Sequence, residues 1–182
     1  MIVYLLGHSG VGKSNAVAAL GVSYPDVAVV DLDAACANHQ TDWTIVGAFL
    51  ADLHATADAG TDMVVDVGAG TQWLGGDCSA FADFLQLCGG PILVVTAPPR
   101  EVILRQPVKG RDMGEFIQTE YTSRQDLYAL ATCTVDVTGL TKEESADRVV
   151  DALLRVLGRP RSSPPVQEQP ALDAEALDRG PS

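Results

Sequence analysis

Eight residues near the start of the chain, Gly7-His8-Ser9-Gly10-Val11-Gly12-Lys13-Ser14, decide the fold. They match the pattern G-x-x-x-x-G-K-[ST] at every fixed position and lie between an apolar run and a helical stretch, as the pattern requires. Glycines let backbone N–H groups in such a loop turn towards phosphate oxygens, and the helix that follows adds its positive dipole end. The segment therefore predicts a loop that binds nucleotide phosphates.

The two polar residues that end this loop have distinct expected roles. Lys13 is expected to reach the β- and γ-phosphates, and the Ser14 hydroxyl to bind Mg²⁺. The sequence contains no N-K-x-D segment of the kind that reads guanine, so ATP is the expected donor. The residues predicted to bind the nucleotide here are Gly7, Ser9, Gly10, Val11, Gly12, Lys13 and Ser14.

Outward from the loop, short apolar runs rich in Val and Ile alternate with helical stretches. The predicted strands are Ile2–Leu6, Val27–Asp31, Met63–Val67, Ile92–Thr96 and Thr134–Val137. The predicted helices are Lys13–Leu20, Asp42–Ala59, Cys78–Leu87, Arg100–Leu104, Gly114–Leu130 and Lys142–Leu157, and Thr141 with Glu144 forms a capping box for the last. This alternation is typical of an α/β protein with a parallel sheet covered on both faces, whose ligands bind beyond the carboxyl ends of the strands.

Composition limits the domain organisation and the partners. A chain of 182 residues with 47% hydrophobic residues suits one folded domain, predicted over residues 1–158. Residues 159–182 are rich in Pro, Ser and Glu and are predicted to be a disordered tail, with contact to a protein partner through this acidic tail left open.

The net charge of −12 argues against nucleic acid as a partner, and no run is long enough to span a membrane. The apolar start, Met1–Leu6, fits a buried strand and not a signal peptide. Four cysteines without a C-x-x-C pair fit reduced thiols in a cytoplasmic protein.

Acidic residues follow the second and third predicted strands. In the segment VAVVDLD, strand alternation places Asp31 and Asp33 on the same side, facing the phosphate loop. One carboxylate could then hold the metal while the other accepts the proton of an attacking hydroxyl; the alternative is that two Asp residues simply begin a loop. In MVVDVGAG, Asp66 lies where a metal-binding acid ends a strand, and 68–70 would allow close approach of a substrate.

Taken in order, the segments resemble shikimate kinase and its small-molecule kinase relatives, over residues 1 to about 157. The segments are GHSGVGKS, VVDLD, VVDVGAG, ILVVTAPPREVILRQ, SRQDLY and TVDVTGLTKEESADRVVDALL. The resemblance implies a three-layer P-loop NTPase fold, with a five-stranded parallel sheet in the order 2-3-1-4-5 between helices and a lid over ATP. It also implies a hydroxylated small molecule as phosphate acceptor.

The same resemblance implies roles for individual residues. Lys13 and Ser14 match the phosphate and magnesium positions. Asp31 matches the acid near the metal, and Asp33 the residue that binds and activates the acceptor hydroxyl. The stretch Gly68, Ala69 and Gly70 resembles the family's substrate loop.

Three arginines also match the pattern. Arg105 resembles the arginine beside adenine, Arg111 the lid arginine that reaches the transferring phosphate, and Arg124 the arginine on the substrate side. The alternative for each is a solvated surface charge. Trp73, beside the glycine loop, is a candidate for the substrate wall.

One departure from the family pattern narrows the acceptor. Shikimate kinases hold a carboxylate of the substrate with two arginines, but no Lys or Arg occurs here from Asn15 to Pro99. A carboxylate on the acceptor would need a guanidinium that this stretch does not supply. The sequence therefore favours phosphoryl transfer from Mg·ATP to a hydroxyl of a neutral or cationic small molecule. A true shikimate kinase and a nucleotide-dependent switch or partner-binding ATPase are the alternatives.

Overall fold

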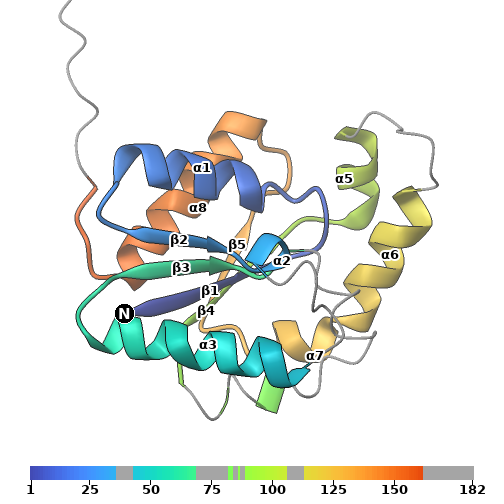
Figure 1. Cartoon of the computed structure of the whole chain (residues 1–182). Helices are drawn as coiled ribbons and strands as arrows, with labels where there is room; N and C mark the ends of the chain where they lie inside the picture. The colour runs from blue at the N-terminus through green and yellow to red at the C-terminus, as the bar shows by residue number, and fades with distance from the viewer. Residues whose placement is uncertain (36–42, 69–81, 84–85, 87–88, 106–112, 162–182) are drawn as a thin grey trace, which may run out of the picture.

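A computed structural model describes residues 1–35, 43–68, 82–83, 86, 89–105 and 113–161. Its centre is a five-stranded sheet in which every neighbouring pair of strands is parallel, in the order β2-β3-β1-β4-β5 (Figure 1). The strands are β1 (Ile2–Leu6), β2 (Ala28–Asp31), β3 (Met63–Asp66), β4 (Ile92–Thr96) and β5 (Cys133–Asp136). The predicted strand order is confirmed, and each predicted strand lies within a residue of the observed one.

Helices cover both faces of the sheet, so alternate residues of one strand enter different cores. Val3 and Leu5 of β1 pack in the core beneath helices α1 (Lys13–Ser23) and α8 (Lys142–Val156). Ile2, Tyr4 and Leu6 pack in the core beneath α3 (Trp43–Asp58), on the opposite face (Figure 1). All five residues of β1 are buried, as expected for a central strand covered on both sides.

The remaining helices lie towards the carboxyl ends of the strands (Figure 1). They are α2 (Leu32–Ala35), α5 (Pro99–Arg105), α6 (Met113–Ser123) and α7 (Gln125–Tyr128). The single helix predicted over 114–130 is divided at Arg124, whose φ of −109° and ψ of 9° depart from helical values. The helix predicted over 78–87 lies largely outside the described residues.

The predicted capping box of α8 is confirmed. The Glu144 amide donates to the Thr141 hydroxyl at 3.2 Å, and the Thr141 amide donates to the Glu144 carboxylate at 2.9 Å. The two bonds give acceptors to the Thr141 and Glu144 N–H groups, which have none within the helix. They therefore fix where α8 begins after β5. No helix in the described part of the chain is long and apolar enough to cross a membrane.

The described chain continues past the predicted domain end at Gly158, and its last residues contact the domain. Arg159 donates to Asp62 and to Asp26, each at 2.6 Å. Arg161 pairs with Asp147 and Asp151 at 3.3 and 2.8 Å. Residues 162–182, and with them most of the predicted tail, lie outside the described residues.

These contacts predict that two truncations will differ in stability. Removal of everything after Gly158 should lower the Tm by about 1–3 °C at neutral pH, because partly exposed ion pairs contribute little, whereas truncation after Arg161 should leave it within about one degree. The Arg159 hydrogen bond lowers the pKa of Asp26. Partial burial raises the pKa of Asp62, but the hydrogen bonds and charges of Arg159 and the N-terminus outweigh it, so the pKa is lowered on balance.

An aspartate whose pKa is lower in the folded than in the unfolded protein stabilises the folded state at a pH above the unfolded pKa. That stabilisation is lost as the pH falls through the folded pKa. The Tm difference between the two truncations should therefore be present at pH 7 and shrink as the pH falls below about 4. Calorimetric scans of both proteins across pH would measure it. Equal Tm values at pH 7 would show that the Arg159 contacts add nothing.

Candidate active site

The phosphate loop joins β1 to α1 and is held tightly against the sheet. Gly7 has φ +150°, and a Cβ there would lie 2.6 Å from the Val95 carbonyl oxygen, so only glycine fits. His8 is fully buried, with Nε2 2.9 Å from the Ala97 carbonyl oxygen and Nδ1 3.0 Å from that of Ser9. Packing on β4 and its continuation thus fixes the path of the loop.

Lys13 lies inside this loop. Its ammonium group is buried and donates to the carbonyl oxygens of Gly7 at 2.6 Å and His8 at 3.3 Å. Burial lowers the pKa of Lys13, while the carboxylates of Asp66 and Glu120 act in the opposite direction. A cation held among backbone dipoles at a helix start attracts anions, because the first amides of a helix lack intrahelical partners.

The loop borders an open pocket of about 270 Å³, lined by Gly10, Gly12, Lys13, Ser14 and Asn15. Five of the residues predicted to bind the nucleotide, Gly7, Gly10, Gly12, Lys13 and Ser14, therefore lie on or beside one concave surface. Val11 is buried and packs into the core under α1 and α8, so its side chain supports the loop from behind. Ser9 differs, because its amide already donates to Glu120.

The acidic residues predicted to bind metal end neighbouring strands. Asp31 of β2 and Asp66 of β3 are register partners, and Asp31 is exposed while Asp66 is buried. Burial raises the pKa of Asp66, Lys13 and the Gly68 amide lower it, and the nearby Asp31 and Asp33 carboxylates raise it further.

This arrangement suits Mg²⁺ that arrives with phosphates. Mg²⁺ is usually held by one or two carboxylates together with phosphate oxygens and waters. The described residues contain no cluster of three or more His, Cys, Asp or Glu that would hold a metal by itself. Asp31, Asp66 and the exposed Ser14 hydroxyl are the donors that fit such an ion, and bound Mg²⁺ would favour the charged form of Asp66.

Asp33 occupies a different position from the one that strand alternation predicts. β2 ends at Asp31, and Asp33 lies in the helical turn α2, so the alternation argument was wrong. The turn forms because Leu32 is fully buried in the core and because the Asp31 carboxylate accepts the Ala34 amide at 3.0 Å. The turn nevertheless brings the half-buried Asp33 carboxylate against Gly68, just beyond β3.

Gly68 thus sets the position of Asp33. Its φ is +67°, its amide donates to Asp66 Oδ1 at 3.0 Å, and an added Cβ would overlap the Asp33 carboxylate. Gly68→Ala should push that carboxylate away and lower turnover by about 10²-fold or more, if Asp33 is the base.

Gly158→Ala provides the control, because Gly158 has a matching φ of +68° and no described atom within 4 Å of an added Cβ. Both variants bear the same backbone strain, so equal Tm losses with unequal kcat/KM would isolate the effect on Asp33. Equal activity in the two variants would contradict this role of Gly68.

Arg124 is buried beside this group and is paired with a residue that sequence reasoning missed. The Arg124 side chain is 1% exposed, and Nη1 lies 3.5 Å from Glu120 Oε1 and 3.5 Å from the Gly68 carbonyl oxygen. The other Glu120 oxygen accepts the Ser9 amide at 2.8 Å. A spacing signal existed: Ile117, Glu120, Arg124 and Leu127 are all buried at helical intervals, which puts charged residues within an apolar stripe.

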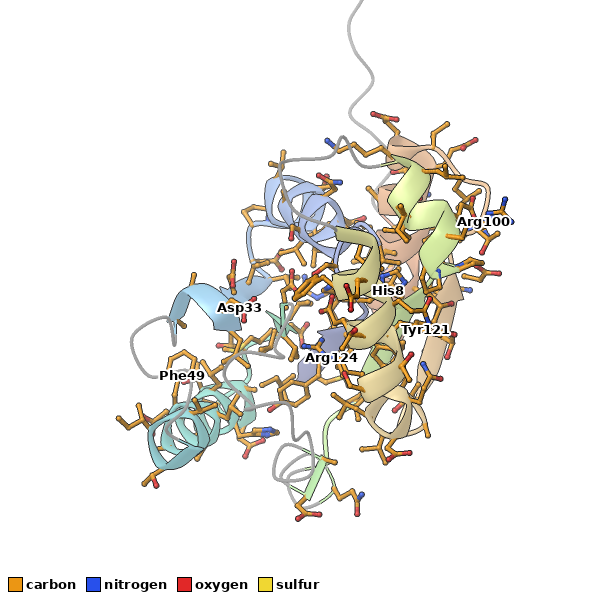
Figure 2. All side chains as sticks on the ribbon, turned by 90° about the vertical axis from the view of Figure 1, so that its right-hand side faces the viewer. His8, Asp33, Phe49, Arg100, Tyr121 and Arg124 are labelled. Atoms are coloured by element: carbon orange, nitrogen blue, oxygen red, sulfur yellow. The ribbon has the colours of Figure 1, made fainter. Side chains whose placement is uncertain are left out.

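Figure 2 looks onto the carboxyl ends of the strands. In this view Arg124 lies between Asp33, on α2, and Tyr121, on α6, with His8 of the phosphate loop above it. The rings of His8 and Tyr121 pack edge to face with their centroids 5.6 Å apart, so the loop contacts α6 there. Elements distant in sequence therefore converge on one edge of the sheet.

Several predicted site residues lie outside the described residues. These are Ala69, Gly70, Trp73 and Arg111. For Arg105 only the backbone is described, as the last residue of α5. Their expected roles in the substrate wall, the lid and adenine binding stay predictions.

Comparison with known proteins finds solved structures with a similar fold. No protein-family model and no curated protein sequence matches the chain. Solved structures do match. Shikimate kinase from Aquifex aeolicus vf5 aligns at 20% identity, over 87% of this chain and 99% of that one, with a TM-score of 0.54. A gluconokinase from Sinorhizobium meliloti 1021 aligns at 15% identity, over 85% and 91%, with a TM-score of 0.57.

The tunicamycin resistance protein of Deinococcus radiodurans aligns at 16% identity, over 90% of this chain and 98% of that one, with a TM-score of 0.63. At these identities the likeness concerns the fold. The phosphate loop and the 2-3-1-4-5 parallel sheet define a P-loop α/β protein. Its structural neighbours include small-molecule kinases, as the sequence resemblance implied.

Proposed function

We propose that the protein is a kinase that transfers the γ-phosphate of Mg·ATP to a hydroxyl of a neutral or cationic small molecule. The observation that carries this proposal is the convergence of Lys13 in the phosphate loop with Asp33, Asp66 and Arg124 at one edge of the sheet. A nucleotide switch needs the loop and the metal ligands. It does not need the Asp33 carboxylate against Gly68 or the buried Arg124 guanidinium beside it.

In this proposal the predicted site residues have separate tasks. The loop amides and Lys13 hold the phosphates, and Ser14 with Asp31 holds Mg²⁺, which neutralises charge on the transferring group. Asp33 accepts the proton of the acceptor hydroxyl. The hydroxyl oxygen then bonds to the γ-phosphorus as the bond from that phosphorus to ADP breaks. Arg111, in the predicted lid, would stabilise the transferring phosphoryl group, and Arg105 would lie beside adenine.

The test is a screen for ADP release. Hydroxylated metabolites, among them neutral polyols, amino sugars, aminocyclitols and hydroxylated amino acids, are incubated with Mg·ATP and the protein. An acceptor-dependent rate well above background supports the proposal. A rate that no acceptor stimulates, but that a protein partner does, would favour the switch or partner-binding ATPase.

Shikimate itself is expected to be a poor acceptor in this screen. Its carboxylate would lose water on entering a site where Glu120 lies 3.5 Å from Arg124, and no second Lys or Arg occurs between Asn15 and Pro99 to pair with that carboxylate. Losing a charged contact of about 2–4 kcal/mol would weaken use of shikimate by roughly tens- to a thousand-fold. Steady-state kinetics beside the better acceptors would measure the ratio. Efficient turnover of shikimate would make the shikimate kinase reading correct.

A further inference from the structure

Glu120 is a buried carboxylate between the phosphate loop and the acceptor side of the site. It lies on α6, is 1% exposed, and one of its oxygens accepts the Ser9 amide of the loop. The other oxygen faces Arg124, whose Nη1 also approaches the Gly68 carbonyl oxygen. Because the Asp33 carboxylate rests on Gly68, Glu120 and Arg124 lie one residue away from the predicted base.

This ion pair leaves hydrogen-bonding groups without partners. Within the described part of the chain, Glu120 Oε1, Arg124 Nε and Arg124 Nη2 are buried and make no hydrogen bond. Buried polar atoms nearly always have partners, and leaving one without a partner is destabilising. One acceptor atom and two donor atoms of this pair are thus left unmatched by the described residues.

The geometry is unlike that of a pair kept for stability alone. Structural arginine–carboxylate pairs commonly form two parallel hydrogen bonds, whereas here a single nitrogen–oxygen approach of 3.5 Å joins the two groups. Glu120 instead uses its second oxygen on the loop. Taking two charges out of water costs free energy that a single long contact repays poorly.

Charge decides which donor fits Glu120 best. Among the described residues around the loop, the carboxylates of Asp31, Asp33, Asp66 and Glu120 outnumber the cations of Lys13 and Arg124. Bound Mg·ATP would add further negative charge. An ammonium group is attracted by this excess, a hydroxyl is not, and a second anion is repelled.

We propose that Glu120 is a specificity-determining residue that binds an amino group of the acceptor through Oε1, while Arg124 binds a neighbouring oxygen of the same molecule. The acceptor class is therefore a hydroxylated amine. This inference rests on the proposed function, since it assigns the substrate class of the same site.

The test compares acceptors in matched pairs that differ at one amino group. The pairs are serinol with glycerol, D-glucosamine with D-glucose, and L-homoserine with γ-hydroxybutyrate. For the unaltered protein, the amine of at least one pair should be used with a kcat/KM about 10- to 100-fold higher than its partner. Equal use of both members of every pair overturns the inference.

Variants assign that preference to Glu120. Glu120→Gln keeps the shape and removes the charge, so the preference for the amine should disappear. Glu115→Gln removes the same charge from an exposed position of α6 and should leave the preference unchanged. A preference that survives Glu120→Gln overturns the assignment. If that variant does not fold, the matched pairs on the unaltered protein decide alone.

Calorimetric binding of the same compounds, with Mg²⁺ and a non-hydrolysable ATP analogue, separates the two proposals. Amine-selective binding without any phosphoryl transfer supports the inference and contradicts the kinase function. Phosphoryl transfer without amine selectivity does the reverse. Failure of every amine to bind overturns the inference.

Discussion

Replacing Asp33 with asparagine should lower turnover by about 10²–10⁴-fold, because general base catalysis contributes that much. Asparagine has nearly the same shape, so it fits against Gly68 but accepts no proton from the acceptor hydroxyl. ATP binding should change little, since Lys13 and the loop amides hold the phosphates. Single-turnover kinetics at saturating ATP, together with nucleotide titration, would separate the two quantities.

The matched control is Asp52→Asn, which removes the same charge from an exposed position on α3. Its turnover should equal that of the unaltered protein. Retained turnover in Asp33→Asn would reject the role of base and favour the nucleotide switch, in which no acceptor hydroxyl has to be activated.

Replacing Lys13 with alanine should abolish ATP-dependent activity and leave the fold intact. The ammonium group now bound to the Gly7 and His8 carbonyl oxygens is the cation expected to reach the β- and γ-phosphates. Loss of a buried charge with a lowered pKa removes a desolvation cost, so the Tm should not collapse.

Lys142→Ala, at the exposed start of α8, is the control for this change. Nucleotide affinity and turnover are measured for both variants, with circular dichroism to confirm folding. Unchanged ATP affinity and turnover in the Lys13 variant would mean that the loop does not bind phosphates in the way proposed.

The fold could be predicted from sequence because it depends on local patterns with clear physical causes. The glycine loop after a buried strand, the Val-rich runs and the Thr141–Glu144 capping box each specify a local structure, and their order specifies the sheet. Helix ends were harder: the helical spacing of buried residues continues through Arg124, although the backbone departs from helical values at that residue.

The site was predictable only in part, because contacts between distant segments create it. Asp33 was chosen on strand alternation, but a helical turn positions it, and its contact with Gly68 is tertiary. Glu120 was missed since a glutamate on a helix is usually solvated, and only the Ser9 amide and Arg124 explain its burial. ATP as donor, the cytoplasmic location and a partner for the tail stay predictions.

Phosphoryl transfer to an acceptor is tested by following the phosphorus atom. The protein is incubated with [γ-³²P]ATP, Mg²⁺ and the best acceptor from the ADP-release screen, and the products are separated and identified by mass spectrometry. The proposed kinase should place label in a phosphate ester on a hydroxyl of the acceptor, at a rate that matches ADP formation and is lost in the Asp33→Asn protein. Label found only in inorganic phosphate, at the same rate with and without acceptor, would contradict it.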